Sequence, residues 1–74
     1  MSTENILEEI KKILEERIRR NKTYIDNSIE LIQTEKRPLE VIVTLTDEIK
    51  RTQIRVSELQ EILRILSSLP NQES

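Results

Sequence analysis

Hydrophobic residues in the first half of the chain follow the period of an α-helix. They recur at spacings of 3, 4, 4, 3, 4, 4 and 3, an eleven-residue repeat with one polar member. The positions of this first stripe are Leu7, Ile10, Leu14, Ile18, Asn21, Ile25, Ile29 and Ile32. The stripe predicts a long helix from about residue 4 to about residue 35. Poor helix formers between residues 21 and 28 raise the alternative of a break there, although no Gly or Pro interrupts the stripe.

The second half of the chain carries a heptad pattern. Its hydrophobic spacing alternates between 3 and 4, which is typical of coiled-coil packing. The positions of this second stripe are Ile42, Leu45, Ile49, Thr52, Val56, Leu59, Leu63 and Leu66. The pattern predicts a second helix from about residue 38 to residue 68. Ser68 and Pro70 discourage further helix, so we expect a frayed C-terminal tail from about residue 69.

A proline separates the two stripes. Pro38 has no backbone N–H, and its ring restricts Arg37 to extended geometry, so one helix should end and another begin in this segment. We expect the chain to fold back here into an antiparallel hairpin. The alternative is one long helix kinked at Pro38, because Leu39 continues the hydrophobic phase between the stripes.

Each stripe contains one polar residue. Folding the chain back at Pro38 aligns Leu7 with Leu66, and the same register aligns Asn21 with Thr52. One polar layer among apolar layers fixes the register of packed helices at some cost in stability. We therefore interpret Asn21 and Thr52 as a register-fixing pair.

Further hydrophobic residues lie beside each stripe, and two helices that face only each other cannot cover them. These residues form a candidate oligomer interface: Ile6, Ile13, Tyr24, Leu31, Val43, Ile54, Ile62, Ile65 and Leu69. If these residues stayed exposed to solvent, the apolar patch would be larger than monomers usually tolerate. The predicted fold is therefore all-α, an antiparallel helical hairpin that dimerises into a four-helix bundle. The partner could instead be a different helical protein.

The composition indicates one small domain spanning residues 1–74. The chain lacks Gly, Cys, His, Trp, Phe and Ala, so neither a disulfide nor a Cys/His zinc site can stabilise it, and self-association is the remaining common remedy. The net charge of −2 gives no general sign of a nucleic-acid or membrane protein. The longest aliphatic run is Val41 to Val43, so we expect no signal peptide, no membrane span and a cytoplasmic location. Abundant Ile, Leu, Glu, Arg and Lys are compatible with a thermophilic source.

No residue pattern indicates catalysis. His and Cys are absent, and acidic neighbours such as Glu8 and Glu9 point in different directions on a helix. Glu58 and Glu61 share a helix face, but the di-iron bundle pattern also requires a His. A phosphate-binding loop needs glycines, which are missing. We expect no enzymatic activity, no cofactor and no metal site.

Basic residues form one cluster that rises above this background. The hairpin register brings two acid-free stretches together across the middle of the bundle, and we call their basic residues the basic belt: Arg17, Arg19, Arg20, Lys22, Lys50, Arg51 and Arg55. Acidic residues four positions away can neutralise part of the belt, in the pairs Glu15–Arg19, Glu16–Arg20 and Asp47–Arg51. The alternative interpretation is a surface for nucleic-acid backbone or an acidic protein.

A dimer of short hairpins with a central basic belt resembles the Rop-type RNA-binding bundles in architecture. The resemblance implies nucleic-acid contact through a central face of the bundle. No motif of that family matches these residues, and the absence of Ala departs from its layering of small and large core residues. Our first hypothesis is therefore a non-enzymatic, homodimeric adaptor or assembly subunit, and the alternative is a small nucleic-acid-binding regulator.

Overall fold

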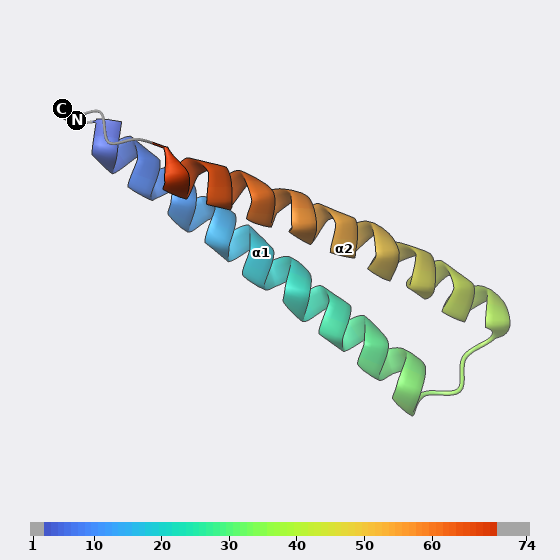
Figure 1. The fold of residues 1–74 in the computed structure, drawn as a ribbon. Coiled ribbons are helices and arrows are strands. Elements are labelled where there is room, and N and C mark those ends of the chain that lie inside the picture. The colour runs from blue at the N-terminus through green and yellow to red at the C-terminus, as the bar shows by residue number, and fades with distance from the viewer. Residues whose placement is uncertain (1–2, 70–74) are drawn as a thin grey trace.

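The chain forms a hairpin of two antiparallel helices. A computed structural model describes residues 3–69, with α1 at Thr3–Thr34 and α2 at Leu39–Ser68, and it contains no strand in that range. The first residues of α1 and the last residues of α2 lie at the same end of the molecule, and the turn lies at the other end (Figure 1). The predicted all-helical hairpin is confirmed. The alternatives of one kinked helix and of a break between residues 21 and 28 are wrong, because the chain reverses after an unbroken α1.

The turn uses Pro38 to begin α2. With φ −55° and ψ 149°, Pro38 is the extended residue just before the helix, so α2 starts one residue later than predicted. The Pro38 carbonyl accepts hydrogen bonds from the N–H groups of Val41 and Ile42 at 3.0 and 3.1 Å. Proline offers no side-chain cap, and these backbone bonds satisfy part of the helix terminus instead.

The described chain ends just beyond α2. Leu69 is extended, with φ −61° and ψ 139°, and its N–H donates to the Leu66 carbonyl at 3.4 Å. This geometry follows from the sequence, because a residue before a proline is disfavoured in the helical region. The rest of the predicted tail, residues 70–74, lies outside the described residues.

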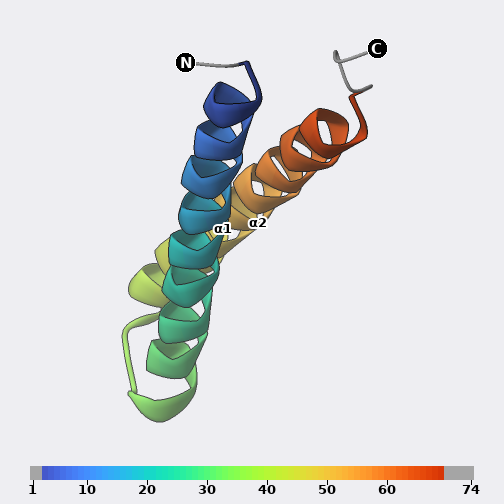
Figure 2. The ribbon, with the colours of Figure 1, turned by 90° about the vertical axis from the view of Figure 1, so that its left-hand side faces the viewer.

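The hairpin is long and thin. It measures 59 × 16 × 14 Å, and its radius of gyration is 17.1 Å, whereas a compact domain of this length has about 11 Å. Figure 1 shows the helices apart near the turn, and Figure 2, at right angles to it, shows them diverging toward the chain ends. The two helices therefore cross, and each has only one helix to pack against.

The core lies where the helices cross. Its most buried residues are Ile18, Ser28, Ile49, Thr52 and Val56. Every member of the second stripe is buried or half-buried, as the heptad pattern predicts.

The contact face of α1 differs from the predicted eleven-residue stripe. Ile10 and Ile29 are 39% and 37% exposed, whereas Lys11 is half-buried and Ser28 is only 3% exposed. The residues that face α2 form a heptad of their own: Leu7, Lys11, Leu14, Ile18, Asn21, Ile25, Ser28 and Ile32. Two helices remain in contact only when their packing faces share a period, and α2 offers a heptad. The hydrophobic stripe of α1 therefore drifts off the contact face, and the stem of Lys11 covers part of the core.

Candidate functional site

One hydrogen bond between the helices defines a side of the hairpin. The Tyr24 hydroxyl on α1 donates to a carboxylate oxygen (Oε2) of Glu48 on α2 at 2.6 Å. A groove of about 440 Å³ lies beside this bond and is lined by Asn21, Tyr24, Glu48, Arg51, Thr52 and Arg55. Because both helices line the groove, Tyr24 and Glu48 mark the same side of the molecule, which we call the tyrosine side.

Helical spacing identifies the other residues of the tyrosine side. Residues three or four apart share a helix face, so each helix can be followed from its marker residue toward the described chain ends. On α1 the tyrosine side carries Ile6, Ile10, Ile13, Arg17, Arg20 and Tyr24, and on α2 it carries Glu48, Arg51, Arg55, Glu58, Ile62 and Ile65, with Leu69 directly after the helix. The tyrosine side is therefore aliphatic near the chain ends and basic in the middle.

The aliphatic part of the tyrosine side forms a patch near the chain ends, which we call the terminal patch. It consists of Ile6, Ile10, Ile13, Ile62, Ile65 and Leu69, whose exposed fractions lie between 39% and 52%. Ile10 was assigned to the core by the first stripe, although its spacing to Ile6 and Ile13 was a signal for this patch. Of the other predicted interface residues, Leu31 is half-buried, and Val43 and Ile54 lie on other sides of α2.

The basic belt is split between the two sides of the hairpin. Residues two apart on a helix point in directions about 200° apart, so Lys22 lies away from Tyr24 and Lys50 lies away from Glu48. Arg19 also lies off the tyrosine side, five positions from Tyr24. The tyrosine side keeps four basic residues, Arg17, Arg20, Arg51 and Arg55.

Glu16 neutralises part of the belt. It accepts hydrogen bonds from Arg19 and, at 3.1 Å, from Nε of Arg20. The bond from Arg19 is the main reason that the pKa of Glu16 is lowered, and Arg20 adds to the effect. The same pair raises the pKa of Arg19. The predicted pair between Glu16 and Arg20 is confirmed.

Three arginines on the tyrosine side keep an unneutralised charge. The predicted pairs Glu15–Arg19 and Asp47–Arg51 are wrong, because Arg19 pairs with Glu16 and Arg51 has no ion pair with any described residue. Among the described residues, Arg17 and Arg55 also lack an ion pair. The positive charge of the tyrosine side is thus concentrated on Arg17, Arg51 and Arg55.

Asn21 and Thr52 lie together at the groove, as the register predicts, but each bonds to its own helix. Nδ2 of Asn21 donates to the Arg17 carbonyl at 2.7 Å, and Oγ1 of Thr52 donates to the Glu48 carbonyl at 2.7 Å. Short polar side chains commonly satisfy themselves in this way within a helix. Their role in fixing the register stays a prediction.

The bond between Tyr24 and Glu48 changes the acidity of the phenol. Donation to the Glu48 carboxylate raises the pKa of Tyr24 above its ordinary value, because the bond favours the protonated phenol. Desolvation and the nearby negative charge also raise the pKa of Tyr24, and the hydroxyl of Ser28 acts in the opposite direction. Tyr24 therefore stays neutral over the ordinary pH range and keeps the proton that it donates to Glu48.

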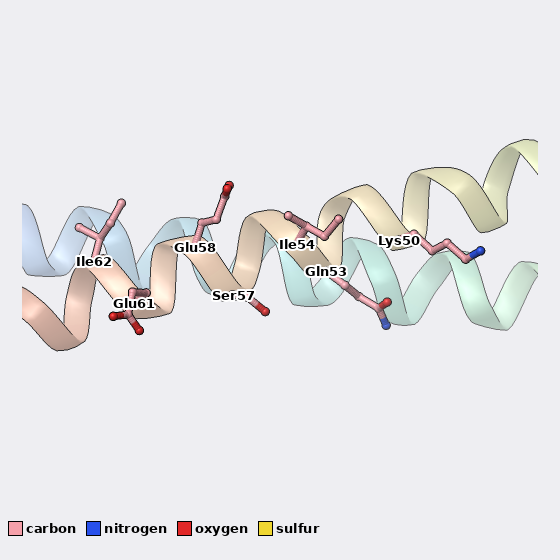
Figure 3. A pocket seen from close by; sticks show the side chains of 7 residues that line it. All are labelled: Lys50, Gln53, Ile54, Ser57, Glu58, Glu61 and Ile62. Carbon is pink, nitrogen blue, oxygen red and sulfur yellow. The ribbon is translucent and has the colours of Figure 1, made fainter.

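A second hollow lies on the outer face of α2. Figure 3 shows its lining residues, Lys50, Gln53, Ile54, Ser57, Glu58, Glu61 and Ile62. All of them belong to α2, so the hollow has no opposite wall and does not enclose a ligand in the way that small-molecule sites do. Among residues 3–69, no group of acidic residues is arranged to hold a metal ion. Over the same range, neither helix is long and apolar enough to cross a membrane.

In comparisons with known proteins, no family model, no curated sequence and no solved structure matches this chain. A function is therefore inferred from the two surfaces of the tyrosine side, the terminal patch and the unpaired arginines.

Proposed function

We propose that this protein is a non-enzymatic interaction protein whose hairpin pairs with a second copy to form a four-helix bundle, and which serves as an adaptor or assembly subunit. The supporting observation is the surface area of the single chain, 6091 Å². A folded monomer of 8.8 kDa exposes about 4,800 Å², so the hairpin exposes about 1,300 Å² more than its mass requires.

The excess area is of the size that protein interfaces bury. A standard interface covers about 800 Å² on each partner, and obligate dimers cover more. Globular domains also need at least two packed layers around a core, whereas this hairpin has one layer that is 14 Å thick. A second hairpin supplies the missing layer and reduces the exposed area of each chain to the range of an ordinary folded protein.

Sedimentation equilibrium tests the proposal. We expect a mass of about 17.6 kDa, twice the 8.8 kDa of the chain, at micromolar protein concentration. A folded species that stays at the monomer mass throughout this range would contradict the proposed dimer.

The unpaired arginines support a second candidate function, a regulator that binds nucleic acid. Arg17, Arg51 and Arg55 lie on one side and form no ion pair with the residues that the structure describes, and phosphate backbones bind such groups by releasing counterions. We expect a complex in a gel-shift titration at low salt, with an affinity that falls steeply as salt rises.

The structure also supplies a matched control for that titration. The double substitution Arg51→Ala and Arg55→Ala should weaken binding to all sequences alike. Arg19→Ala removes an arginine that is already paired with Glu16 and lies off the tyrosine side, so it should have a smaller effect. If no complex forms at low salt, the nucleic-acid candidate is wrong.

A further inference from the structure

We infer that the terminal patch is where the second copy docks. This inference rests on the proposed dimer and specifies which surface is covered. The patch gathers six half-exposed aliphatic side chains at one end of the tyrosine side: Ile6, Ile10, Ile13, Ile62, Ile65 and Leu69. Of the other strongly exposed aliphatic residues of α2, Leu39 and Val43 lie outside this cluster, and Ile54 lines the hollow on the outer face of α2 together with Ile62.

The core beneath the patch is also incomplete. All five of the most buried residues lie between Ile18 and Val56, toward the middle and the turn. At the patch end, the inner residues Leu7, Leu14, Leu59, Leu63 and Leu66 are only half-buried. This end is also where the helices diverge in Figure 2. A partner that covers the patch would therefore exclude water from both the flanking and the inner aliphatic residues of this end.

The chemistry of the patch fits a second copy of the same chain. The six residues carry no charged or hydrogen-bonding side-chain group, so two patches can meet without removing water from an unpaired charge. At the edge of the patch that lies toward the middle of the hairpin, the tyrosine side carries both signs of charge: Arg17 and Arg55 are cationic, and Glu58 is anionic. None of these three residues has an ion pair within the described chain. An isologous interface brings the same surface together twice, so a cation of one copy can meet a carboxylate of the other. The terminal patch is part of the excess of about 1,300 Å² that the whole hairpin exposes.

Thiol protection can locate the covered surface, because the chain has no Cys of its own. Ile13→Cys places a thiol in the patch, and Val43→Cys places one outside it. Ile13 is 52% exposed and Val43 is 51% exposed in the single chain, so the two positions are matched. The rate of reaction with a soluble disulfide reagent is measured for each variant over a range of protein concentrations, with sedimentation equilibrium on the same samples.

The expected result is a loss of reactivity at Ile13→Cys alone. At a protein concentration 100 times the dissociation constant of the variant, fewer than about one chain in ten is monomeric, so its rate should fall at least about tenfold. The rate for Val43→Cys should not change. Each comparison is made within one variant, so a difference in thiol pKa between the two positions cancels.

The two levels of the proposal fail in different ways. If both variants stay monomeric and react at rates independent of concentration, the proposed dimer is wrong. If they dimerise while the thiol at position 13 reacts as fast as in the monomer, the dimer stands and the terminal patch is not its interface. Protection at position 43 without protection at position 13 would place the interface on another side of α2 and also overturn the inference.

Discussion

The middle of the hairpin and its terminal end use similar aliphatic residues in different environments. In the middle, Ile18, Ile49 and Val56 are 7% to 9% exposed, and the buried set also includes the smaller Ser28 and Thr52. At the terminal end, large Leu and Ile side chains occupy both the inner and the flanking positions, and none of them is buried. Small residues beside large ones let facing side chains interdigitate, so the middle packs closely around Ser28 and Thr52. The aliphatic residues of the terminal end stay half-exposed in the hairpin.

The largest difference between the two regions should appear on truncation to Ala. Ile49→Ala leaves a cavity in the crossing region and should lower the free energy of unfolding by about 2 to 4 kcal/mol. Ile13→Ala should lower it by less than about 1 kcal/mol when the protein is dilute, because Ile13 is already half in water. Urea unfolding followed by circular dichroism measures both values.

The difference between Ile49→Ala and Ile13→Ala should depend on protein concentration. Where the dimer is populated, the loss caused by Ile13→Ala should grow, because unfolding then also breaks the interface. The loss caused by Ile49→Ala should change much less. Equal losses of unfolding free energy at the two positions in dilute solution would contradict the division between a buried middle and a half-exposed terminal end.

The middle should also be sensitive to added volume. Ser28 is 3% exposed and faces α2, so Ser28→Leu should push the helices apart and cost about 1 to 3 kcal/mol. Ser28→Ala is the matched control, and it should stay within about 0.5 kcal/mol because Ala fits the same space and favours helix. Thermal unfolding of the two variants distinguishes these outcomes. A tolerated Leu at position 28 would mean that the crossing region is not closely packed.

The polar residues of the groove should have a smaller effect on stability. The hydroxyl of Thr52 bonds within α2, so Thr52→Val should change the free energy of unfolding by less than about 1 kcal/mol. Adding Asn21→Leu removes the whole polar layer and should stabilise the helices while loosening their register. Disulfide trapping between a Cys at position 14 and a Cys at position 59 reports the register. If the double variant traps as efficiently as a parent with both polar residues, the layer does not fix the register.

The sequence predicts the hairpin well because its strongest signals are local or periodic. Pro38 marks the turn to within one residue, and the heptad of α2 identifies its contact face. The contact face of α1 is not predicted, because hydrophobicity favours Ile10 and Ile29 while the geometry of two crossing helices favours Lys11 and Ser28. The heptad of α2 determines which α1 residues make contact, and the hydrophobic spacing of α1 alone does not predict them.

The candidate surfaces are only partly visible in the sequence. The register aligns Asn21 with Thr52, and these two residues line the groove together with Arg51 and Arg55. It does not separate the two sides of the hairpin, so Lys22 and Lys50 were grouped with arginines that point elsewhere. The hydrogen bond between Tyr24 and Glu48 was not predicted from the sequence. It requires that the flank of α1 with Tyr24 and the flank of α2 with Glu48 lie on the same side of the hairpin. Which flanks of α1 and α2 share a side is determined by the handed geometry of two antiparallel helices in contact.

The smallest expected effect concerns Tyr24, which joins the buried middle to the tyrosine side. Its pKa is raised above the ordinary value of about 10, chiefly by donation to Glu48, so the folded state holds the phenolic proton more tightly than the unfolded chain does. The stabilising contribution of the bond is therefore complete below about pH 10 and is lost as the pH rises through the folded pKa of Tyr24.

A titration of the phenol measures this shift. Tyr24 is the only Tyr and there is no Trp, so the absorbance of the phenolate reports this residue alone. Glu48→Gln should return the midpoint of the titration toward its ordinary value, whereas Glu40→Gln, an exposed residue of the first turn of α2, should leave it unchanged. An identical midpoint in the Glu48→Gln variant and the unsubstituted protein would show that the bond does not tie the two helices in solution.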